Sequence, residues 1–368
     1  MKLRAAYLRV LAVIGLGVAA VMAGVPGGPA ARAATTMPAP SITVADGNSV
    51  IAATTVTFGL NFYWNEYGTN NWHAEQVAGN ATTAMSAPSV AQVGNGVDIA
   101  ARGVTNNLDF YWQVNGASGW NPEVVAGPGT TFSTPVVVQD GNSTIIAAEG
   151  PRNSLDFYWA VNGTATWHAE VVAGAGTTYS APALIVNGNS VNIAAEGPND
   201  SLDFYWAVNG SPTWNPEVVA GAGTTLSAPA MVANNGGVDI VALDAQSPQS
   251  ALLDFYWAFN GNSTWNLETI PEITTSGAAM TTYPGGVHVV NSNVFSMVID
   301  MANPNGTTTW NQRQPSLGQT VTAVPAVTMN KGSENVAYID VEGDLYFSWQ
   351  DSSNKFHIEE VDSSELLT

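Results

Sequence analysis

The hydrophobic pattern of this chain is short, alternating and repeated. In the segment SLDFYWAVNG (Ser154–Gly163), Leu, Phe and Trp alternate with Asp and Tyr, and a period of two is typical of a β-strand. Both alternating sets contain aromatic residues, so the strand is expected to be covered on both faces. The same ten residues return at Ser201–Gly210, 47 positions later. Self-similarity at a fixed period indicates a repeat architecture.

The tryptophans give the number of units. A first tryptophan recurs at steps of 48, 47, 47, 51 and 92 residues: Trp64, Trp112, Trp159, Trp206, Trp257 and Trp349. A second follows eight residues later in five units: Trp72, Trp120, Trp167, Trp214 and Trp265. The step of 92 spans two units, and Trp310 marks the additional one, in which Val294–Met297 is expected to stand in place of LDFYW. The spacing therefore predicts seven units of about 47 residues.

Each unit contains four apolar segments. In the fourth unit they are Ser180–Val186, Val191–Ala195, Leu202–Val208 and Trp214–Val219, and turns rich in glycine and asparagine separate them. Asn187-Gly188 tolerates the positive φ of a hairpin turn. No window has apolar residues at helical spacing, and 36 glycines with 20 prolines interrupt every candidate helix. The pattern predicts an all-β fold, a seven-bladed β-propeller of four-stranded blades.

The ends of the repeat region are in phase. The first unit begins near Thr36 and the last ends near Val361, so no strand is expected to pass between the first and last blades. Residues 1–33 have the pattern of a secretory signal peptide, with basic Lys2, Arg4 and Arg9 before an apolar run and a small-residue cleavage site. Residues 34–368 are expected to form a single propeller domain that is secreted and extracellular.

The charge of the chain limits its partners. The net charge is −20, and residues 1–33 hold four of the nine basic residues and none of the 29 acidic ones. Five minus 29 leaves −24 for the mature chain, which argues against nucleic acid because that affinity comes from cations. Residues 34–368 hold no long apolar stretch, so no membrane insertion is expected. No cysteine is present, so no disulfide stabilises the fold.

Signatures of catalysis and metal binding are missing from the sequence. It has no GxSxG elbow and no HExxH motif. Three of the four histidines share a repeat position with asparagines, which favours a hydrogen-bonding role in a strand. A glutamate three residues after the second aromatic recurs in six units, and such equivalent copies are expected to be rim charges or turn acceptors. The oxygen-rich segments Asp46–Ser49 and Asp140–Ser143 are predicted to be hairpin turns. We predict no enzyme activity, no cofactor and no metal.

Two roles remain open for the tryptophans. They can pack one blade against the next, or stack on the apolar face of a pyranose whose hydroxyls bind polar neighbours. On the second interpretation, the candidate carbohydrate-binding residues are Trp120, Trp167 and Trp214. The loop between the second and third strands supplies the polar candidates Arg102, Glu149, Glu196, Asn153 and Asn199.

The order SAPALIV, VNIAAEG, SLDFYW and W-x-x-E over residues 36–361 resembles the repeat of secreted bacterial β-propeller lectins. These include seven-bladed lectins and a fucose-specific group. The resemblance implies a multivalent carbohydrate-binding protein with shallow sites between neighbouring blades. In the fucose-specific group an arginine, a glutamate and an aromatic residue hold each sugar, and Arg102 stands near such a position while Glu149 and Glu196 replace it in later units.

Three classes of function therefore remain open. The first is a lectin-like propeller without catalytic activity, whose partners are glycans. The second is an extracellular structural or protein-interaction propeller that binds cell-surface proteins. The third is a glycosidase or lyase, which would need a polar cluster that does not repeat around the ring.

Overall fold

The structure is a computed structural model that describes residues 38–363, apart from positions 67, 115, 116, 118, 246–251, 260 and 261. Residues 1–33, for which a signal peptide is predicted, lie outside this part. The described strands form seven antiparallel sheets of four strands each. No helix among the described residues is long and apolar enough to cross a membrane.

The first four blades follow the chain without interruption. Blade 1 contains β1 (Ser41–Ala45), β2 (Asn48–Thr54), β3 (Leu60–Asn65) and β4 (Trp72–Ala78). Blade 2 contains β5 (Ser89–Val93), β6 (Gly96–Arg102), β7 (Leu108–Val114) and β8 (Asn121–Ala126). Blade 3 contains β9 (Val136–Asp140), β10 (Ser143–Glu149), β11 (Leu155–Val161) and β12 (His168–Ala173). Blade 4 contains β13 (Ala183–Asn187), β14 (Ser190–Glu196), β15 (Leu202–Val208) and β16 (Asn215–Ala220).

The last three blades have the same order. Blade 5 contains β17 (Ala230–Asn234), β18 (Gly237–Leu243), β19 (Leu253–Phe259) and β20 (Asn266–Ile270). Blade 6 contains β21 (Thr274–Tyr283), β22 (Gly286–Asn293), β23 (Val298–Pro304) and β24 (Asn311–Arg313). Blade 7 contains β25 (Ala326–Asn330), β26 (Ser333–Ile339), β27 (Leu345–Gln350) and β28 (Phe356–Asp362).

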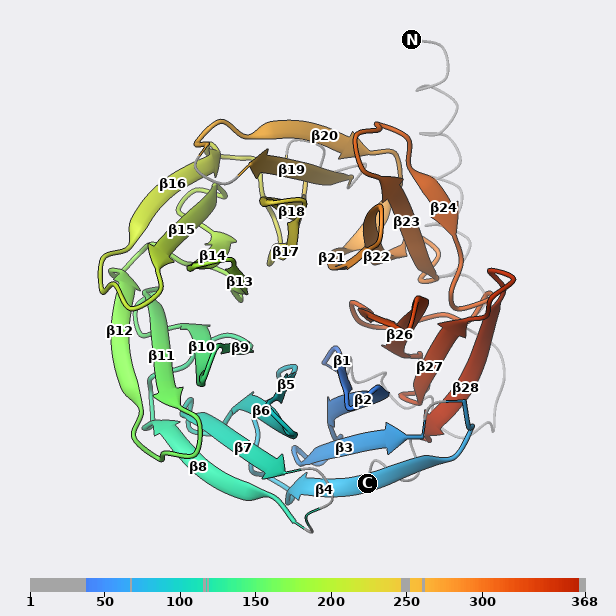
Figure 1. Ribbon diagram of the computed structural model, residues 1–368, viewed down its shortest axis with the longest axis horizontal. Helices are drawn as coiled ribbons and strands as arrows, with labels where there is room; N and C mark the ends of the chain where they lie inside the picture. Colours follow the sequence, from blue (N-terminus) through green and yellow to red (C-terminus); the bar gives the residue numbers. More distant parts are fainter. Residues whose placement is uncertain are drawn as a thin grey trace, which may run out of the picture. The chain divides into compact units, whose positions relative to one another are not determined.

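The blades form a closed ring. The first strand of each blade lies towards the centre and the fourth lies on the outside (Figure 1). Neighbouring first strands contact one another all the way round, including β25 with β1. Because β1–β4 and β25–β28 each form a complete sheet, the prediction of a seven-bladed propeller without strand exchange is confirmed. The Tyr63 hydroxyl donates to Asp362 across the closure (2.6 Å).

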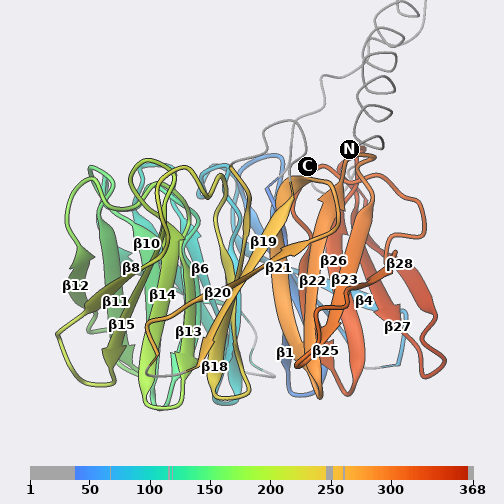
Figure 2. The same cartoon turned by 90° about the horizontal axis from the view of Figure 1, so that it is seen from above.

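The strands run between two loop-bearing faces of the ring (Figure 2). One face carries the turns between the first and second strands and between the third and fourth strands, and we call it the hairpin face. The other carries the loops between the second and third strands and the connections between blades, and we call it the loop face. The antiparallel pairing of consecutive strands places these two sets of connections at opposite ends of every blade.

The predicted strands of blade 4 are confirmed within about three residues. Only the first differs visibly, because β13 begins at Ala183 rather than at Ser180, after Pro182, which has no N–H to contribute to a ladder. The turn between β13 and β14 places Gly188 at a φ of +61°, as the Asn-Gly pair predicted. The equivalent turns at Gly47 and Gly141 also have positive φ.

The sixth unit required a correction of register. The sequence predicted that Val294–Met297 replaces LDFYW, but the third strand is β23, which begins at Val298. Pairing with β22 and β24 places Asp300 at the position of the repeated Phe and Ala302 at that of the first Trp. With neither aromatic residue present, the sequence offered no marker for the register of this strand.

The core lies between blades rather than within them. Among the described residues, a buried apolar cluster occupies each of the seven joints between neighbouring blades. Phe204 of β15 belongs to the cluster shared with blade 5, and the adjacent Tyr205 belongs to the cluster shared with blade 3. The alternating aromatic residues of the third strand therefore cover both faces of the blade, as the sequence predicted.

Candidate functional site

A tryptophan–glutamate–tryptophan bridge joins neighbouring blades near the hairpin face. Between blades 2 and 3, Trp112 Nε1 donates to Glu123 Oε1 (2.8 Å) and Trp167 Nε1 donates to Glu123 Oε2 (2.9 Å). Trp159 and Trp214 bind Glu170 in the same way between blades 3 and 4. The bridge recurs at the ring closure, where Trp349 and Trp72 bind Glu359. One carboxylate therefore holds the first tryptophan of its own blade and the second tryptophan of the next.

The second tryptophan also packs against the preceding blade. Its indole meets the repeated phenylalanine of that blade edge to face, with ring centroids 5.0–5.2 Å apart, in the pairs Phe62–Trp120, Phe347–Trp72, Phe110–Trp167, Phe157–Trp214, Phe204–Trp265 and Phe255–Trp310. This geometry suits the electrostatics of aromatic pairs. The second tryptophans therefore pack one blade against the next, which is the first of the two roles considered for them, and this packing stabilises the joints.

These contacts correct one prediction about polar residues and refine another. Five of the six recurring glutamates are not solvated rim charges, because they accept hydrogen bonds from half-buried indoles. The histidines of the shared position stack on the first tryptophan, as in Trp159–His168 with centroids 4.1 Å apart. Asparagine at that position instead donates to the backbone, as Asn215 does to the Trp206 carbonyl (3.2 Å). His357 also makes a hydrogen bond, from Nε2 to Asp351 Oδ2 (2.8 Å). The predicted hydrogen-bonding role therefore holds for these asparagines and for His357.

Concave pockets open between blades beside these bridges. The pocket between blades 4 and 5 has a volume of about 540 Å³ and is lined by Trp206, Glu217 and Trp265. Comparable pockets of about 370, 370 and 450 Å³ lie at the joints between blades 3 and 4, 5 and 6, and 7 and 1. All four are lined by a first tryptophan, its glutamate and residues of the hairpin turns: Trp159 with Glu170, Trp206 with Glu217, Trp257 with Glu268, and Trp349 with Glu359.

The pockets have the composition of small-molecule sites, with aromatic walls and a few placed polar groups. The hairpin of β13 and β14 contributes Asn187, Asn189 and Asn192 to the pocket between blades 4 and 5. Phe259, at the end of β19, lines this pocket and the next one, and it is 58% exposed. Valine takes its place at the ends of β7, β11 and β15, so blade 5 presents an additional exposed aromatic surface.

Sequence reasoning found only part of this arrangement. Of the predicted candidates, Trp214 lines a hairpin-face pocket, and Trp167 forms the bridge to Glu123. Trp120 packs on Phe62, and its indole N–H is buried without a partner. The first tryptophans and their glutamates were not among the candidates. Their joint recurrence in the repeat is the signal that could have revealed them, because an acceptor repeated together with two indoles suggests a bond between them.

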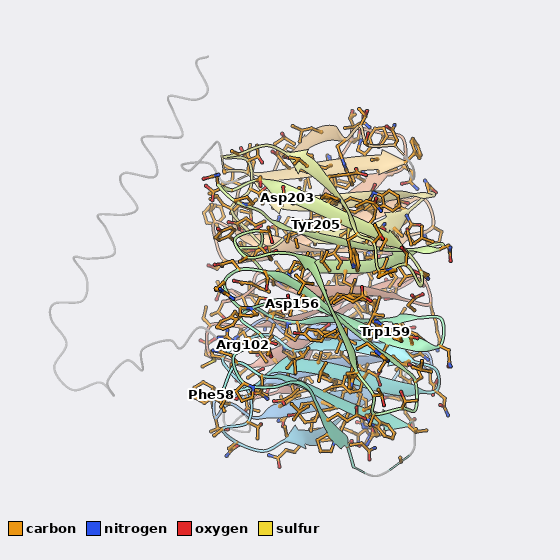
Figure 3. All side chains as sticks on the ribbon, turned by 90° about the vertical axis from the view of Figure 1, so that its left-hand side faces the viewer. Phe58, Arg102, Asp156, Trp159, Asp203 and Tyr205 are labelled. Carbon is orange, nitrogen blue, oxygen red and sulfur yellow. The ribbon has the colours of Figure 1, made fainter. Side chains whose placement is uncertain are left out.

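The polar candidates lie at the opposite face of the ring. Glu149 pairs with Leu155 at the loop-face end of β10, four residues from Trp159, which is about 13 Å along a strand. Figure 3 shows Arg102 at one face and Trp159 towards the other. The structure therefore does not bring Arg102, Glu149, Glu196, Asn153 or Asn199 together with the tryptophans.

The loop-face candidates form contacts of their own. The Arg102 guanidinium donates to Asn106 (2.6 Å), and the Asn153 amide donates to Glu149 Oε1 (2.8 Å). Burial raises the pKa of Glu149, while the Asn153 bond and the Arg102 charge oppose that rise. The backbone carbonyls of Asn153 and Asn199 accept hydrogen bonds from the connection to the next blade. Both residues have positive φ, a conformation that asparagine tolerates better than most residues.

Glu196 differs from Glu149 because an acid occupies the position of Asn153. Burial, together with the charges of Asp200 and Glu149, raises the pKa of Glu196 to about 7. A raised carboxyl pKa stabilises the fold below the ordinary glutamate pKa of 4.5, and this contribution is lost as the pH rises through the folded-state pKa. The melting temperature of the parent protein should therefore fall between pH 5 and pH 8.

Replacing Asp200 by asparagine should reduce this fall. The variant removes a like charge and provides an amide that can donate to Glu196, as Asn153 does to Glu149, so the pKa of Glu196 should decrease. Thermal unfolding of parent and variant at pH 5 and pH 8 measures the difference, and Asn153→Asp is the matched reverse change at Glu149. An equal fall in parent and Asp200→Asn would contradict the assignment.

A polar cluster that does not repeat lies between blades 6 and 7. The Arg313 guanidinium binds Asp300 and Glu334 (2.6 Å to Glu334), and it also contacts His288 Nδ1 at 2.6 Å. Because a guanidinium can only donate, this imidazole nitrogen accepts. Burial and the charge of Asp300 raise the pKa of Glu334 well above its usual range.

This cluster is a structural ion-pair network. Asp300 and Glu334 are fully buried, and they lie on β23 and β26, behind the inner strands that line the centre of the ring (Figure 1). Ligand atoms of His288, Asp300 and Glu334 lie within 4.8 Å of one another, a spacing that would suit a metal ion. Arg313 already supplies the positive charge between them, so these residues do not fit a cation site.

The fold is similar to that of propeller lectins of known structure. The BP39L lectin from Burkholderia pseudomallei matches with a TM-score of 0.74 and 17% identity, over 88% of this chain and 98% of the lectin. A variant of the Aleuria aurantia lectin in complex with Fucα1-6GlcNAc matches with a TM-score of 0.54 and 10% identity, over 77% of this chain and 96% of that one. The resemblance to propeller lectins is thus confirmed at the level of fold.

Other comparisons are less informative. A puromycin-hydrolyzing peptidase from Mycobacterium tuberculosis matches with a TM-score of 0.59 and 12% identity, over 88% of this chain and 52% of the peptidase. No family profile and no curated protein matches the sequence. At these identities the similarities concern the fold, and a propeller fold serves many functions.

Proposed function

We propose that this protein is a secreted, multivalent carbohydrate-binding propeller without catalytic activity, and that it binds neutral sugars in the pockets between blades at the hairpin face. The observation that carries the proposal is the recurrence of one pocket at four joints, each time with an indole, a carboxylate and hairpin residues. Indole faces stack on the apolar faces of pyranoses, and carboxylate and amide groups bind their hydroxyls.

Two further features support the proposal. The two propeller lectins named above share the fold, and one of them is in complex with a fucosylated disaccharide. Several equivalent pockets on one ring would give avidity to a surface glycan even where each site is weak. The mature net charge of −24, from five basic and 29 acidic residues, favours neutral over acidic sugars.

A glycan array with residues 34–368 tests the function, and two variants test the location. Phe259→Val gives blade 5 the residue that blades 2, 3 and 4 have at this position, so it removes the exposed ring without leaving a cavity. It should weaken binding of a neutral glycan severalfold, because the ring lines two pockets. Glu196→Gln, at the loop face, is the matched control and should bind like the parent.

The outcomes separate the alternatives. Selective binding that Phe259→Val weakens and Glu196→Gln preserves supports the proposal. Loss of binding in Glu196→Gln alone would move the sugar site to the loop face. No binding by a folded parent would overturn the lectin function, and the extracellular protein-interaction propeller would then be the better account. Hydrolysis or elimination of an arrayed glycan would instead favour a glycosidase or lyase.

A further inference from the structure

Residues of the second strands are matched in polarity across most joints. Asp98 accepts a hydrogen bond from Thr144 of the next blade (2.7 Å), and Asn335 donates to Ser49 (2.6 Å). His288 Nδ1 lies 3.8 Å from Glu334 Oε2, and these two residues occupy the same positions in their second strands as Asp98 and Thr144. At two other joints the matched residues are apolar, namely Val50 with Val97 and Ile145 with Val191. At these joints a polar side chain thus faces a polar one and an apolar side chain faces an apolar one, because buried polar groups need hydrogen-bond partners.

The joint between blades 4 and 5 breaks this pattern. Asn192 stands opposite Val238, which offers no hydrogen bond, and both residues line the pocket. Asn192 is only 2% exposed, and its Oδ1 is buried without a partner. The next joint also places a polar residue, Asp239, opposite a valine, but there Asn234 donates to the carboxylate (2.7 Å). Asn187, which occupies the place of Asn234 in blade 4, donates to the Gly237 carbonyl (3.0 Å).

The indole bridge is also incomplete at this joint. Trp206 Nε1 donates to Glu217 Oε1 (2.8 Å), but Trp265 Nε1, which should complete the bridge, is buried without a partner. The second tryptophan of the joints 2–3, 3–4, 5–6 and 7–1 binds its glutamate at 2.9–3.2 Å. Trp120, at the joint of blades 1 and 2, also lacks a partner, but there the second-strand residues Val50 and Val97 leave no polar group unmatched. The pocket of about 540 Å³ is therefore lined by two residues, Asn192 and Trp265, that each have a buried polar atom without a hydrogen-bond partner.

Unsatisfied buried polar groups are costly, so they point to a bound group that completes them. Resting on the proposed function, we infer that the pocket between blades 4 and 5 is the strongest sugar site of the ring. It takes an uncharged saccharide with one hydroxyl that donates to Asn192 Oδ1 and one oxygen that accepts from Trp265 Nε1. Glu217 and Phe259 in the same pocket disfavour a carboxylated sugar and provide an apolar surface.

Two substitutions remove the unsatisfied acceptor in different ways. Asn192→Val restores the apolar pairing seen at Ile145–Val191, and Val238→Thr supplies the hydroxyl that Thr144 supplies to Asp98. Both should keep or raise the melting temperature, by about 2 °C, because they relieve an unmet hydrogen bond. Both should weaken the affinity of the strongest sugar site about tenfold, which is the effect of one lost hydrogen bond.

The measurement is isothermal titration of residues 34–368 with methyl glycosides of fucose, mannose, galactose and glucose, and with the methyl glycoside of N-acetylneuraminic acid as the acidic probe. Asn335→Val is the matched control, since it removes a paired amide at the joint of blades 7 and 1. It should lower the melting temperature and leave the affinity of the strongest sugar site unchanged.

Each result decides one claim. Weaker sugar binding in stable Asn192→Val and Val238→Thr, with unchanged affinity of the strongest site in Asn335→Val, supports the proposed site. Unchanged binding of neutral glycosides in both variants would overturn this inference while the proposed function stands. Preference for the acidic probe would contradict the ligand class. Failure of the parent to bind any probe here or on the array would count against the proposed function itself.

Discussion

Replacing Arg313 by methionine is expected to lower the free energy of unfolding by about 3–5 kcal/mol, the largest effect of any single substitution considered. Arg313 is the cation between two acids, Asp300 and Glu334, whose side chains are 0% and 1% exposed. Removing one partner of a buried ion pair leaves an uncompensated charge in a medium that solvates it poorly. Chemical unfolding of parent and variant measures the loss.

The triple variant Asp300→Phe, Arg313→Met and Glu334→Val serves as the control. It returns two of these positions to the residues that the repeat has elsewhere, Phe204 and Val238 in blades 4 and 5, and removes the cation together with both acidic side chains. Buried ion pairs can often be replaced by packed apolar groups at no net cost, so the triple variant should regain most of the stability. A triple variant no more stable than Arg313→Met would show that the cluster acts through packing rather than charge.

Replacing Glu123 by alanine should lower the free energy of unfolding by about 3 kcal/mol, because hydrogen bonds to a charged group contribute about 1.5–3 kcal/mol each. Glu123 holds Trp112 of its own blade and Trp167 of the next. The substitution therefore leaves two half-buried indole donors without an acceptor and loosens the joint between blades 2 and 3. The midpoint of unfolding in urea, with its slope, measures the change.

Glu217→Ala is the matched substitution at the incomplete joint. Glu217 accepts from Trp206, while Trp265 Nε1 has no partner, so the loss should be about half as large. Equal losses in the two variants would contradict the assignment of the bridges, because, of these two glutamates, only Glu123 accepts hydrogen bonds from two indoles.

The fold was predictable because the repeat carries its own markers. The spacing of the tryptophans fixed seven units, and the aromatic alternation of SLDFYW indicated a strand covered on both faces, as Phe204 and Tyr205 confirm. Blade 6 shows the limit of this reasoning. Where Asp300 and Ala302 replace the aromatic markers, the predicted register was displaced by four residues, from Val294 to Val298.

The site was less predictable because it depends on which end of a blade each side chain occupies and on what the next blade offers. Glu149 and Glu196 are close to the tryptophans in sequence but lie at the other face of the ring. The unmet hydrogen bond of Asn192 depends on Val238, 46 positions away. A single unit shows neither relation, because both arise only when two blades pack together.

A crystal structure of residues 34–368 with the neutral glycan that binds best on the array tests the central claim most directly. The account predicts sugar density in the hairpin-face pockets, against Trp159, Trp206, Trp257 and Trp349, with fullest occupancy between blades 4 and 5. Sugar bound at the loop face, beside Glu149 and Glu196, with the hairpin-face pockets free of ligand, would contradict it.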